Sequence, residues 1–280
     1  MTRQTLLNLI FNGLGALLGL TILGYVAYSL VHKEVEPPCS ARYPAPTRFA
    51  LYASGGGLLT PLELQARVGL NEWGINENAK VVADTAAPGG AALEVSLKSV
   101  PEIETGGRHA NGIHFRWTPQ GVRAASSACL SYSLWLPNDF AFDTAGLLPA
   151  LFGGASGAAA TAVGSEGGFA ARFAWRAGGD AALFVATAGQ GFAAVNQAGF
   201  PLPKGRFMRI EQELVLNAPG EANGSARLWL DGELKAETKR LELRKDASAT
   251  IAGVLADIGY VRAPAKPGVL RLTPFELSWK

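Results

Sequence analysis

Histidine and arginine side chains recur on the polar side of two segments in which apolar and polar residues alternate. A tryptophan lies on the polar side of a third such segment, between the other two in the sequence. Guanidinium groups bind carboxylates through paired hydrogen bonds, and an indole ring can stack on the face of a sugar. If the three segments share one sheet, these side chains form a binding site for an anionic polysaccharide. A solvated sheet face with scattered arginines would show the same pattern. The residues concerned are His114, Arg116, Trp135, Arg172 and Arg176.

Motifs of several common enzyme classes are absent from the sequence. It holds no G-x-S-x-G, no P-loop and no H-E-x-x-H, and its carboxylates show no local pairing typical of a glycosidase. The three histidines, His32, His109 and His114, cannot supply a histidine-rich metal site. A net charge of +2 is too small to indicate nucleic acid as a partner. The sequence therefore predicts neither a metal nor a cofactor.

Short alternating segments separated by turn residues make up most of the chain after residue 80. The clearest pair lies in residues 204–232, where two arms alternate with period two and are joined by Asn, Pro and Gly residues, which predicts an antiparallel hairpin. In residues 168–176, Phe169, Phe173 and Trp175 share the side opposite the two arginines. Strands at this spacing, with almost no helical periodicity, predict an all-β sandwich. Further segments of this kind are 81–84, 93–97, 112–117, 130–136, 182–186 and 269–279, and the Ala/Gly-rich run 153–168 predicts a mobile loop.

The beginning of the chain predicts a membrane anchor. Residues 6–31 are almost entirely apolar, and about 20 such residues suffice for one transmembrane helix. A cleaved signal peptide is the alternative, with Ala27-Tyr28-Ser29 as a small-x-small site. An anchor would hold the protein in the inner (plasma) membrane, with its larger C-terminal part periplasmic or extracellular. We expect an anchor over residues 1–32, a Pro-rich tether over 33–48 and a β domain over 49–280.

Two cysteines are present, one in the expected tether and one directly before the expected strand 130–136. Cys39 and Cys129 show no metal-binding spacing. In an exported domain they can form a single long-range disulfide, and two free buried thiols are the alternative.

Three stretches of the sequence carry motifs of one family. Residues 136–154 contain LPNDF and then GLLPALFGG, residues 168–176 read GFAARFAWR, and residues 205–232 contain GR, IEQ and DG at matching spacing. In order and spacing, most of residues 80–280 resembles the alginate-lyase-like proteins, and more narrowly the family 14 polysaccharide lyases. The resemblance implies a β-jelly roll sandwich with concanavalin-like antiparallel sheets, and a polyuronate as the ligand.

The catalytic positions of that family are largely replaced. β-Elimination requires a group that neutralises the uronate carboxylate, a base for the C5 proton and an acid for the leaving oxygen. Arg172 is retained and can do the first. The residues at the other positions cannot transfer protons: Leu147 stands for a lysine, Ala170 for a serine, and Phe184 and Ala186 lie near two tyrosines.

We therefore expect a membrane-anchored, non-catalytic protein that recognises an anionic or neutral polysaccharide, with proteins of exopolysaccharide synthesis or export as partners. An active polyuronate lyase is the second hypothesis, with His114 or Tyr132 as the base and Arg116 and Arg172 on the carboxylate. A structural subunit of a membrane complex is the third.

Overall fold

A computed structural model describes residues 3–31, 36–69, 72–99, 111–155, 168–187, 193–195, 199–262 and 264–280. The chain forms two compact units, Met1–Glu36 and Pro37–Lys280. The β strands all belong to the second unit, which carries the candidate site.

Helix α1 (Arg3–Val31) is the element described in the first unit. A membrane crossing takes about 20 consecutive apolar residues in one helix. No helix in the described part of the chain is both long enough and apolar enough for this. The transmembrane helix expected within residues 1–32 is therefore not supported.

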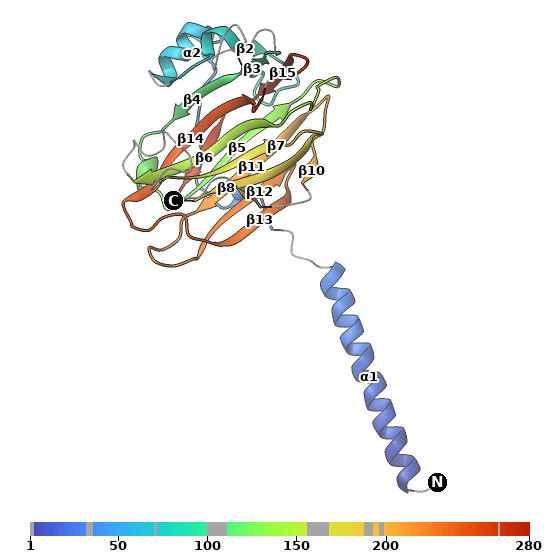
Figure 1. Cartoon of the computed structure of the whole chain (residues 1–280). Helices are drawn as coiled ribbons and strands as arrows, with labels where there is room; N and C mark the ends of the chain where they lie inside the picture. The colour runs from blue at the N-terminus through green and yellow to red at the C-terminus, as the bar shows by residue number, and fades with distance from the viewer. Residues whose placement is uncertain are drawn as a thin grey trace. The chain divides into compact units, whose positions relative to one another are not determined.

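The second unit is an all-β sandwich of two antiparallel sheets, as the sequence predicts (Figure 1). In the described residues, what we call the β5 sheet has the order β13-β12-β11-β5-β15-β3-β2, with β16 beside β5 and β1 beside β16. The strands of the β5 sheet are β1 (Thr47–Arg48), β2 (Ala79–Ala83), β3 (Ala91–Leu97), β5 (Ser127–Trp135), β11 (Phe207–Val215), β12 (Gly224–Leu230), β13 (Glu233–Leu241), β15 (Gly268–Leu272) and β16 (Glu276–Trp279).

The facing sheet, which we call the β7 sheet, has the order β10-β8-β7-β6-β14-β4 in the described residues, with β9 beside β8. Its strands are β4 (Ile113–Trp117), β6 (Gly146–Ala155), β7 (Gly168–Trp175), β8 (Asp180–Ala186), β9 (Ala193–Ala194), β10 (Phe200–Pro201) and β14 (Ala249–Tyr260). The apolar side chains of the two sheets meet in one core.

The hairpin expected in residues 204–232 is confirmed, because β11 pairs antiparallel with β12. Alternation directs Met208 and Ile210 into the core, while Glu211, which follows Ile210, lies on the outer side. The next turn is the two-residue Asp231-Gly232, with φ of 49° and 83°. Positive φ at both residues is the type I′ geometry that suits a tight hairpin, and Asp-Gly is one of the residue pairs that favour it.

The alternation expected in β7 is confirmed as well. Phe169, Phe173 and Trp175 lie in the core between the sheets, and Trp175 is only 1% exposed. Its indole ring meets the rings of Phe140 and Tyr260 edge-on, at centroid distances of 5.7 and 5.8 Å. Arg172 has the opposite parity and faces outward, which places a cation on the outer face of the β7 sheet.

A β-bulge in β14 determines which of its later residues face outward. The pairing with β6 shifts between Ile251 and Gly253, and both Ile251 and Val254 point into the core. Gly253 has a φ of +135°, and a Cβ there would lie 2.1 Å from the carbonyl oxygen of Trp117. Only glycine fits such a position. Beyond the bulge, alternation places Asp257 on the outer face.

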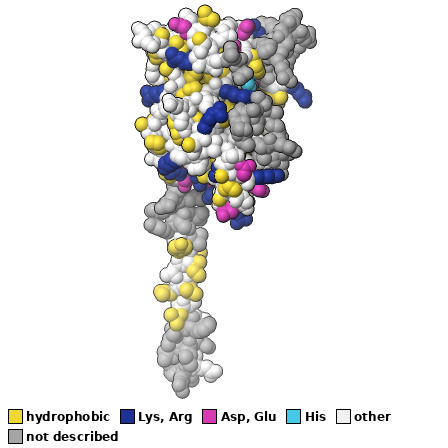
Figure 2. Space-filling model, turned by 90° about the vertical axis from the view of Figure 1, so that its left-hand side faces the viewer, with side chains coloured by type: hydrophobic (Ala, Val, Ile, Leu, Met, Phe, Trp, Pro, Cys, Tyr) yellow, Lys and Arg dark blue, Asp and Glu magenta, His cyan; other side chains and the backbone are white. Residues whose placement is uncertain are grey.

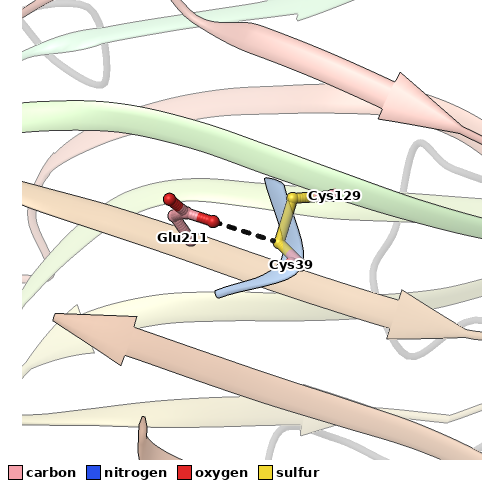
Figure 3. A group of neighbouring side chains, drawn as sticks. All are labelled: Cys39, Cys129 and Glu211. Carbon is pink, nitrogen blue, oxygen red and sulfur yellow. Dashed lines mark hydrogen bonds between the residues drawn. A yellow bond between two sulfur atoms is a disulfide. The ribbon is translucent and has the colours of Figure 1, made fainter. Parts of the chain in front are cut away.

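The tether expected over residues 33–48 is wrong from Pro37 onward, because this part belongs to the second unit. β1 pairs with β16, and Cys39 forms a disulfide with Cys129 of β5. Figure 3 shows the carboxylate of Glu211 directed toward the same disulfide. The disulfide alternative is confirmed, and it fixes the segment to the outer face of the β5 sheet.

Short helices interrupt the all-β pattern. Helix α2 (Pro61–Val68) begins with a capping box, in which the Thr60 side chain accepts from the backbone N–H of Glu63 and the Glu63 carboxylate accepts from that of Thr60. This local signal was not used in the sequence analysis, which predicts almost no helix. The other helices in the described residues of this unit are α3 (Ile75–Asn78) and the 3₁₀ turns η1 (Cys39–Ala41) and η3 (Val122–Ala124).

Two further expectations concern single segments. Residues 269–279 were expected to form one strand but form most of β15 and all of β16, both of which pair with β5. The centre of the Ala/Gly-rich run, residues 156–167, lies outside the described residues.

Candidate functional site

A row of neighbouring side chains crosses the outer face of the β7 sheet. His114 of β4 lies opposite Asp257 of β14, and Phe184 of β8 lies opposite Arg172 of β7. Arg172 joins the two halves by an ion pair with Asp257. From β4 to β8 there are four strand-to-strand steps, which give a length of about 19 Å at the usual strand spacing. We call these four residues the cross-strand row.

An ion pair occupies the centre of the row. The Nη1 of Arg172 donates to Oδ2 of Asp257 at 2.8 Å, and Arg172 is 3% exposed. Burial raises the pKa of the Asp257 carboxyl, but a hydrogen bond from His114 and the charge of Arg172 outweigh it and hold this pKa below its ordinary value. The Asp257 carboxyl is therefore ionised at neutral pH, and the retained arginine already binds this carboxylate of the protein.

The histidine of the row is held from two sides. Its Nδ1 lies 3.6 Å from Oδ1 of Asp257. Its ring stacks on Trp73, with centroids 5.5 Å apart and planes inclined by 8°. Figure 2 shows one histidine side chain at the surface beside lysine and arginine side chains. The carboxylate and the indole together fix the plane of the imidazole.

A pocket of about 250 Å³ opens beside Arg172 at the Phe184 end of the row. Apolar side chains form most of its wall and two arginines provide its charge. The Arg176 guanidinium lies 5.7 Å above the centre of the Phe184 ring. Leu147 and Phe184 are positions where the family resemblance implies proton-transfer groups, so the pocket presents cations and apolar surface in their place. The wall includes Leu147, Arg172, Ala174, Arg176, Phe184 and Val261.

Four of the five binding residues expected from the sequence lie at this site: His114, Arg172, Arg176 and Arg116. Arg116 of β4 lies opposite Leu255 of β14 and 5.9 Å above the Phe152 ring. The apolar side chains around it form a small cluster of their own, separate from the main core: Ala150, Phe152, Ala170, Ala252 and Leu255.

The expectation for Trp135 is wrong. Trp135 ends β5, whereas His114 and Arg172 belong to strands of the other sheet. It lies on the outer side of the β5 sheet, where the Arg271 guanidinium sits 4.8 Å above its ring. Alternation gave the correct side of its strand, but it carries no information on which strands pair. The condition that the three segments share one sheet is not met.

Tyr132 cannot act as a base for a ligand on the outer face. It is fully buried between the sheets, where Gln212 Nε2 lies 3.4 Å from its hydroxyl. The same amide donates to the Pro149 carbonyl at 2.9 Å. Burial raises the pKa of Tyr132 well above its ordinary value, so the phenol stays neutral. The alternative that named Tyr132 as the base is wrong.

Asp257 is the site residue that the sequence analysis missed. It lies in VLADIGY, where Val254, Ala256 and Ile258 alternate with outward-facing positions and point into the core. The alternation could have revealed an acidic residue on the outer side of a strand. Its pairing with His114 and Arg172 could not be read from the sequence, because the three residues are more than 50 positions apart and meet only through strand order.

Replacing Asp257 with Asn is expected to lower the free energy of unfolding at pH 7 by about 3 kcal/mol, because it leaves the Arg172 charge buried without its carboxylate. The folded-state pKa of Asp257 is lowered, so its contribution is present above the unfolded pKa of about 3.9 and is lost as pH falls through the folded value. Urea denaturation from pH 7 to pH 2 should show the gap between wild type and variant closing below about pH 4. Glu233→Gln, which removes an exposed partner of Lys235, should change stability by less than about 1 kcal/mol. A gap that stays constant with pH would contradict the ion-pair assignment.

One group of side chains in the described residues has the chemistry of metal ligands: Cys39, Cys129 and Glu211, whose ligand atoms lie within 4.8 Å of one another. The two sulfurs are joined in a disulfide, so they carry neither a proton nor a thiolate charge. The 3.7 Å approach of Glu211 Oε2 to Cys39 Sγ is therefore a contact of a buried carboxylate with a disulfide. In the oxidised protein this group does not bind a metal.

Comparison with solved structures shows the same sandwich in alginate lyases. A marine PL-14 alginate lyase from Aplysia kurodai is 17% identical, with a TM-score of 0.67 over 75% of this chain and 90% of that one. The alginate lyase vAL-1 from a Chlorella virus is 17% identical, with a TM-score of 0.61 over 72% and 89%. A mutant of alginate lyase Aly36B in complex with alginate trisaccharide is 14% identical, with a TM-score of 0.60 over 85% and 99%. At these identities the likeness shows a common fold.

A search of curated protein sequences gave no match. The sequence model of the family described as polysaccharide lyase 14 matches residues 86–260, which include the strands of the cross-strand row and of the pocket. This match extends over more than half of the chain, and it agrees with the resemblance found in the sequence motifs. The chain belongs to the polysaccharide lyase 14 family.

Proposed function

We propose that this protein binds a polyuronate across the outer face of the β7 sheet and does not cleave it. One observation carries the proposal: the pocket beside Arg172 is lined by Leu147 and Phe184, at positions where the family resemblance implies the proton-transfer groups that elimination needs. Cationic side chains remain along the same face and favour an anionic chain. Binding without cleavage would serve a protein that handles an exopolysaccharide during synthesis or export.

The proposal also takes the C-terminal unit to work outside the cytoplasm. Its support is the buried Cys39–Cys129 disulfide, since such bonds persist in oxidising compartments and are rare in the cytosol. Labelling of free thiols in protein taken from intact cells and then unfolded without reductant, which exposes the buried sulfurs, would test this. The expected result is no labelling of either cysteine before reduction, and labelling of both without reductant would contradict it.

The first test is for lyase activity on a panel of polyuronates, read as the absorbance of unsaturated products, with binding measured on the same samples. We expect no product above background, because the missing acid and base would each contribute roughly 10²–10⁴-fold to the rate. We expect binding that weakens in Arg176→Gln. This variant is preferable to Arg172→Ala, which would also remove the guanidinium partner of the half-buried Asp257 carboxylate. An active alginate lyase serves as the positive control for product detection.

An active lyase is the second candidate, and one contact favours it. The Asp257 carboxylate lies 3.6 Å from Nδ1 of His114, and a carboxylate in this position can orient an imidazole toward a proton on the ligand. In this case His114 would take the C5 proton. Release of unsaturated products that is lost in His114→Gln would establish this candidate and overturn the non-catalytic proposal.

A further inference from the structure

Three buried side chains with the chemistry of metal ligands meet on the outer face of the β5 sheet. Cys39 comes from the segment before β1, Cys129 from β5 and Glu211 from β11, and Figure 3 shows them directed toward one another. Their exposed fractions are 0%, 2% and 5%. The spacing of the two cysteines in the sequence gave no sign of a metal site, because the third ligand is brought to them only by the pairing of β5 with β11.

The position of the carboxylate matches the geometry of a zinc site. Zinc binds a thiolate sulfur at about 2.3 Å and a carboxylate oxygen at about 2.0–2.2 Å in a tetrahedral arrangement. A sulfur and an oxygen bound to the same zinc ion therefore lie about 3.5–3.7 Å apart. Oε2 of Glu211 lies 3.7 Å from Sγ of Cys39. A disulfide sulfur has no proton to donate, so in the oxidised protein this approach is not a hydrogen bond.

The carboxylate is held in this position by neighbouring groups. The backbone N–H of Ser40 donates to Oε2 of Glu211 and the Ser40 hydroxyl donates to Oε1, both at 2.9 Å. Nε of Arg209 lies 3.4 Å from the same Oε1. Carboxylates that bind a metal are oriented by outer hydrogen bonds of this kind. The main-chain oxygen of Gln212, 3.7 Å from Cys39 Sγ, offers a fourth ligand.

The charges around the three side chains also suit a divalent cation. Two thiolates and a carboxylate carry three negative charges, and a divalent cation supplies two positive ones. Arg209 is paired with Glu211, and the Arg42 guanidinium lies 5.5 Å above the ring of Trp229, which packs against both cysteines. Cations near a cysteine favour the thiolate, which is the form that binds metals.

From this arrangement we propose that Cys39, Cys129 and Glu211 bind a zinc-like divalent cation when the disulfide is reduced. Exchange with a small dithiol breaks the S–S bond, each sulfur gains one electron and one proton, and the dithiol is oxidised to its own disulfide. The metal then replaces the two thiol protons, which pass to water. The disulfide and the metal exclude each other, and either one ties the segment that carries Cys39 to β5. This inference does not depend on the proposed function.

The test uses the full-length protein, reduced by a phosphine while unfolded in urea and then refolded without oxygen or reductant, with and without Zn²⁺. The refolded protein is titrated with Co²⁺, whose absorption bands report tetrahedral thiolate ligation. We expect these bands in the reduced protein, their loss when Zn²⁺ displaces Co²⁺, and no bands in the oxidised protein. A folded, reduced protein without the bands would overturn the inference. If the reduced chain does not fold, failure of Zn²⁺ to restore folding would overturn it as well.

Two single variants locate the third ligand. Glu211→Gln should weaken Co²⁺ binding by more than about tenfold, since the loss of an outer partner alone costs roughly 10–100-fold. Glu213→Gln is the matched control, because Glu213 is equally buried on the same side of β11 but pairs with Arg42 and Arg227. It should keep the wild-type affinity. Equal affinity in wild type and Glu211→Gln would overturn the three-ligand site.

Discussion

Replacing both Cys39 and Cys129 with serine is expected to lower the free energy of unfolding by about 2–5 kcal/mol. The bond joins residues 90 positions apart, and a closed loop of this length greatly restricts the unfolded chain. In the folded state both sulfurs pack with Trp229 in a buried cluster, so their loss also disturbs packing. Urea denaturation of the oxidised wild type, the wild type kept reduced by a dithiol and the double variant would measure the effect.

The control for this prediction is Ser40→Ala, which keeps the disulfide but removes a hydroxyl that donates to Glu211 at 2.9 Å. One such hydrogen bond contributes roughly 1 kcal/mol, or more because its acceptor is charged. Limited proteolysis should cut the segment before residue 49 faster in the double variant than in Ser40→Ala. If the double variant were no less stable than Ser40→Ala, the disulfide would not be what holds the segment on the sheet.

Trp175→Ala is expected to lower the free energy of unfolding by about 3–5 kcal/mol. The ring is almost fully buried, and it contacts Phe140, Phe142 and Tyr260 edge-on. Gly146 leaves the space into which the indole fits, since a Cβ there would lie 1.8 Å from the ring. Truncation therefore opens a cavity among aromatic rings that cannot readily close. Thermal and urea denaturation would both report the loss.

Trp135→Ala is the matched control, because it removes the same side chain from the outer face of the other sheet. There the indole is partly exposed and contacts Arg271, so a loss of about 1 kcal/mol is expected. The loss in free energy of unfolding for Trp175→Phe should lie between those of the two alanine variants. This variant keeps an aromatic ring but lacks the indole N–H that donates to the Thr144 carbonyl. Equal losses for Trp175→Ala and Trp135→Ala would contradict the assignment of Trp175 to the core.

Alternation predicted the side of a strand on which a residue lies, because successive side chains point to opposite faces whatever the partner strand. It succeeded for Trp175 and Arg172 in β7 and for Ile210 and Glu211 in β11. It failed for Trp135 only when residues of different strands were combined into one site.

The order of the strands in each sheet could not be predicted from the sequence. His114 and Asp257 are neighbours because β4 pairs with β14, although the two residues are 143 positions apart in the sequence. The bulge at Gly253 then decides that Asp257 faces outward, and one residue fewer would turn it into the core. Neither the pairing of β4 with β14 nor the bulge at Gly253 can be recognised from neighbouring residues in the sequence. The capping box of α2 and the Asp231-Gly232 turn can be recognised in this way.

The disulfide also determines on which strand of the β sandwich a pulling force would act. A force pulling on α1 reaches the second unit near Cys39 and passes through the sulfur bridge into β5. β5 is an interior strand, hydrogen-bonded to β11 on one side and to β15 and β16 on the other. A force on β5 must break the hydrogen bonds to its neighbouring strands together. If the disulfide were reduced, the segment that carries Cys39 would instead detach from the sheet one contact at a time. In the oxidised domain several strand pairings must therefore break together. The time for which the domain stays folded under a pulling force then depends on its rate of forced unfolding.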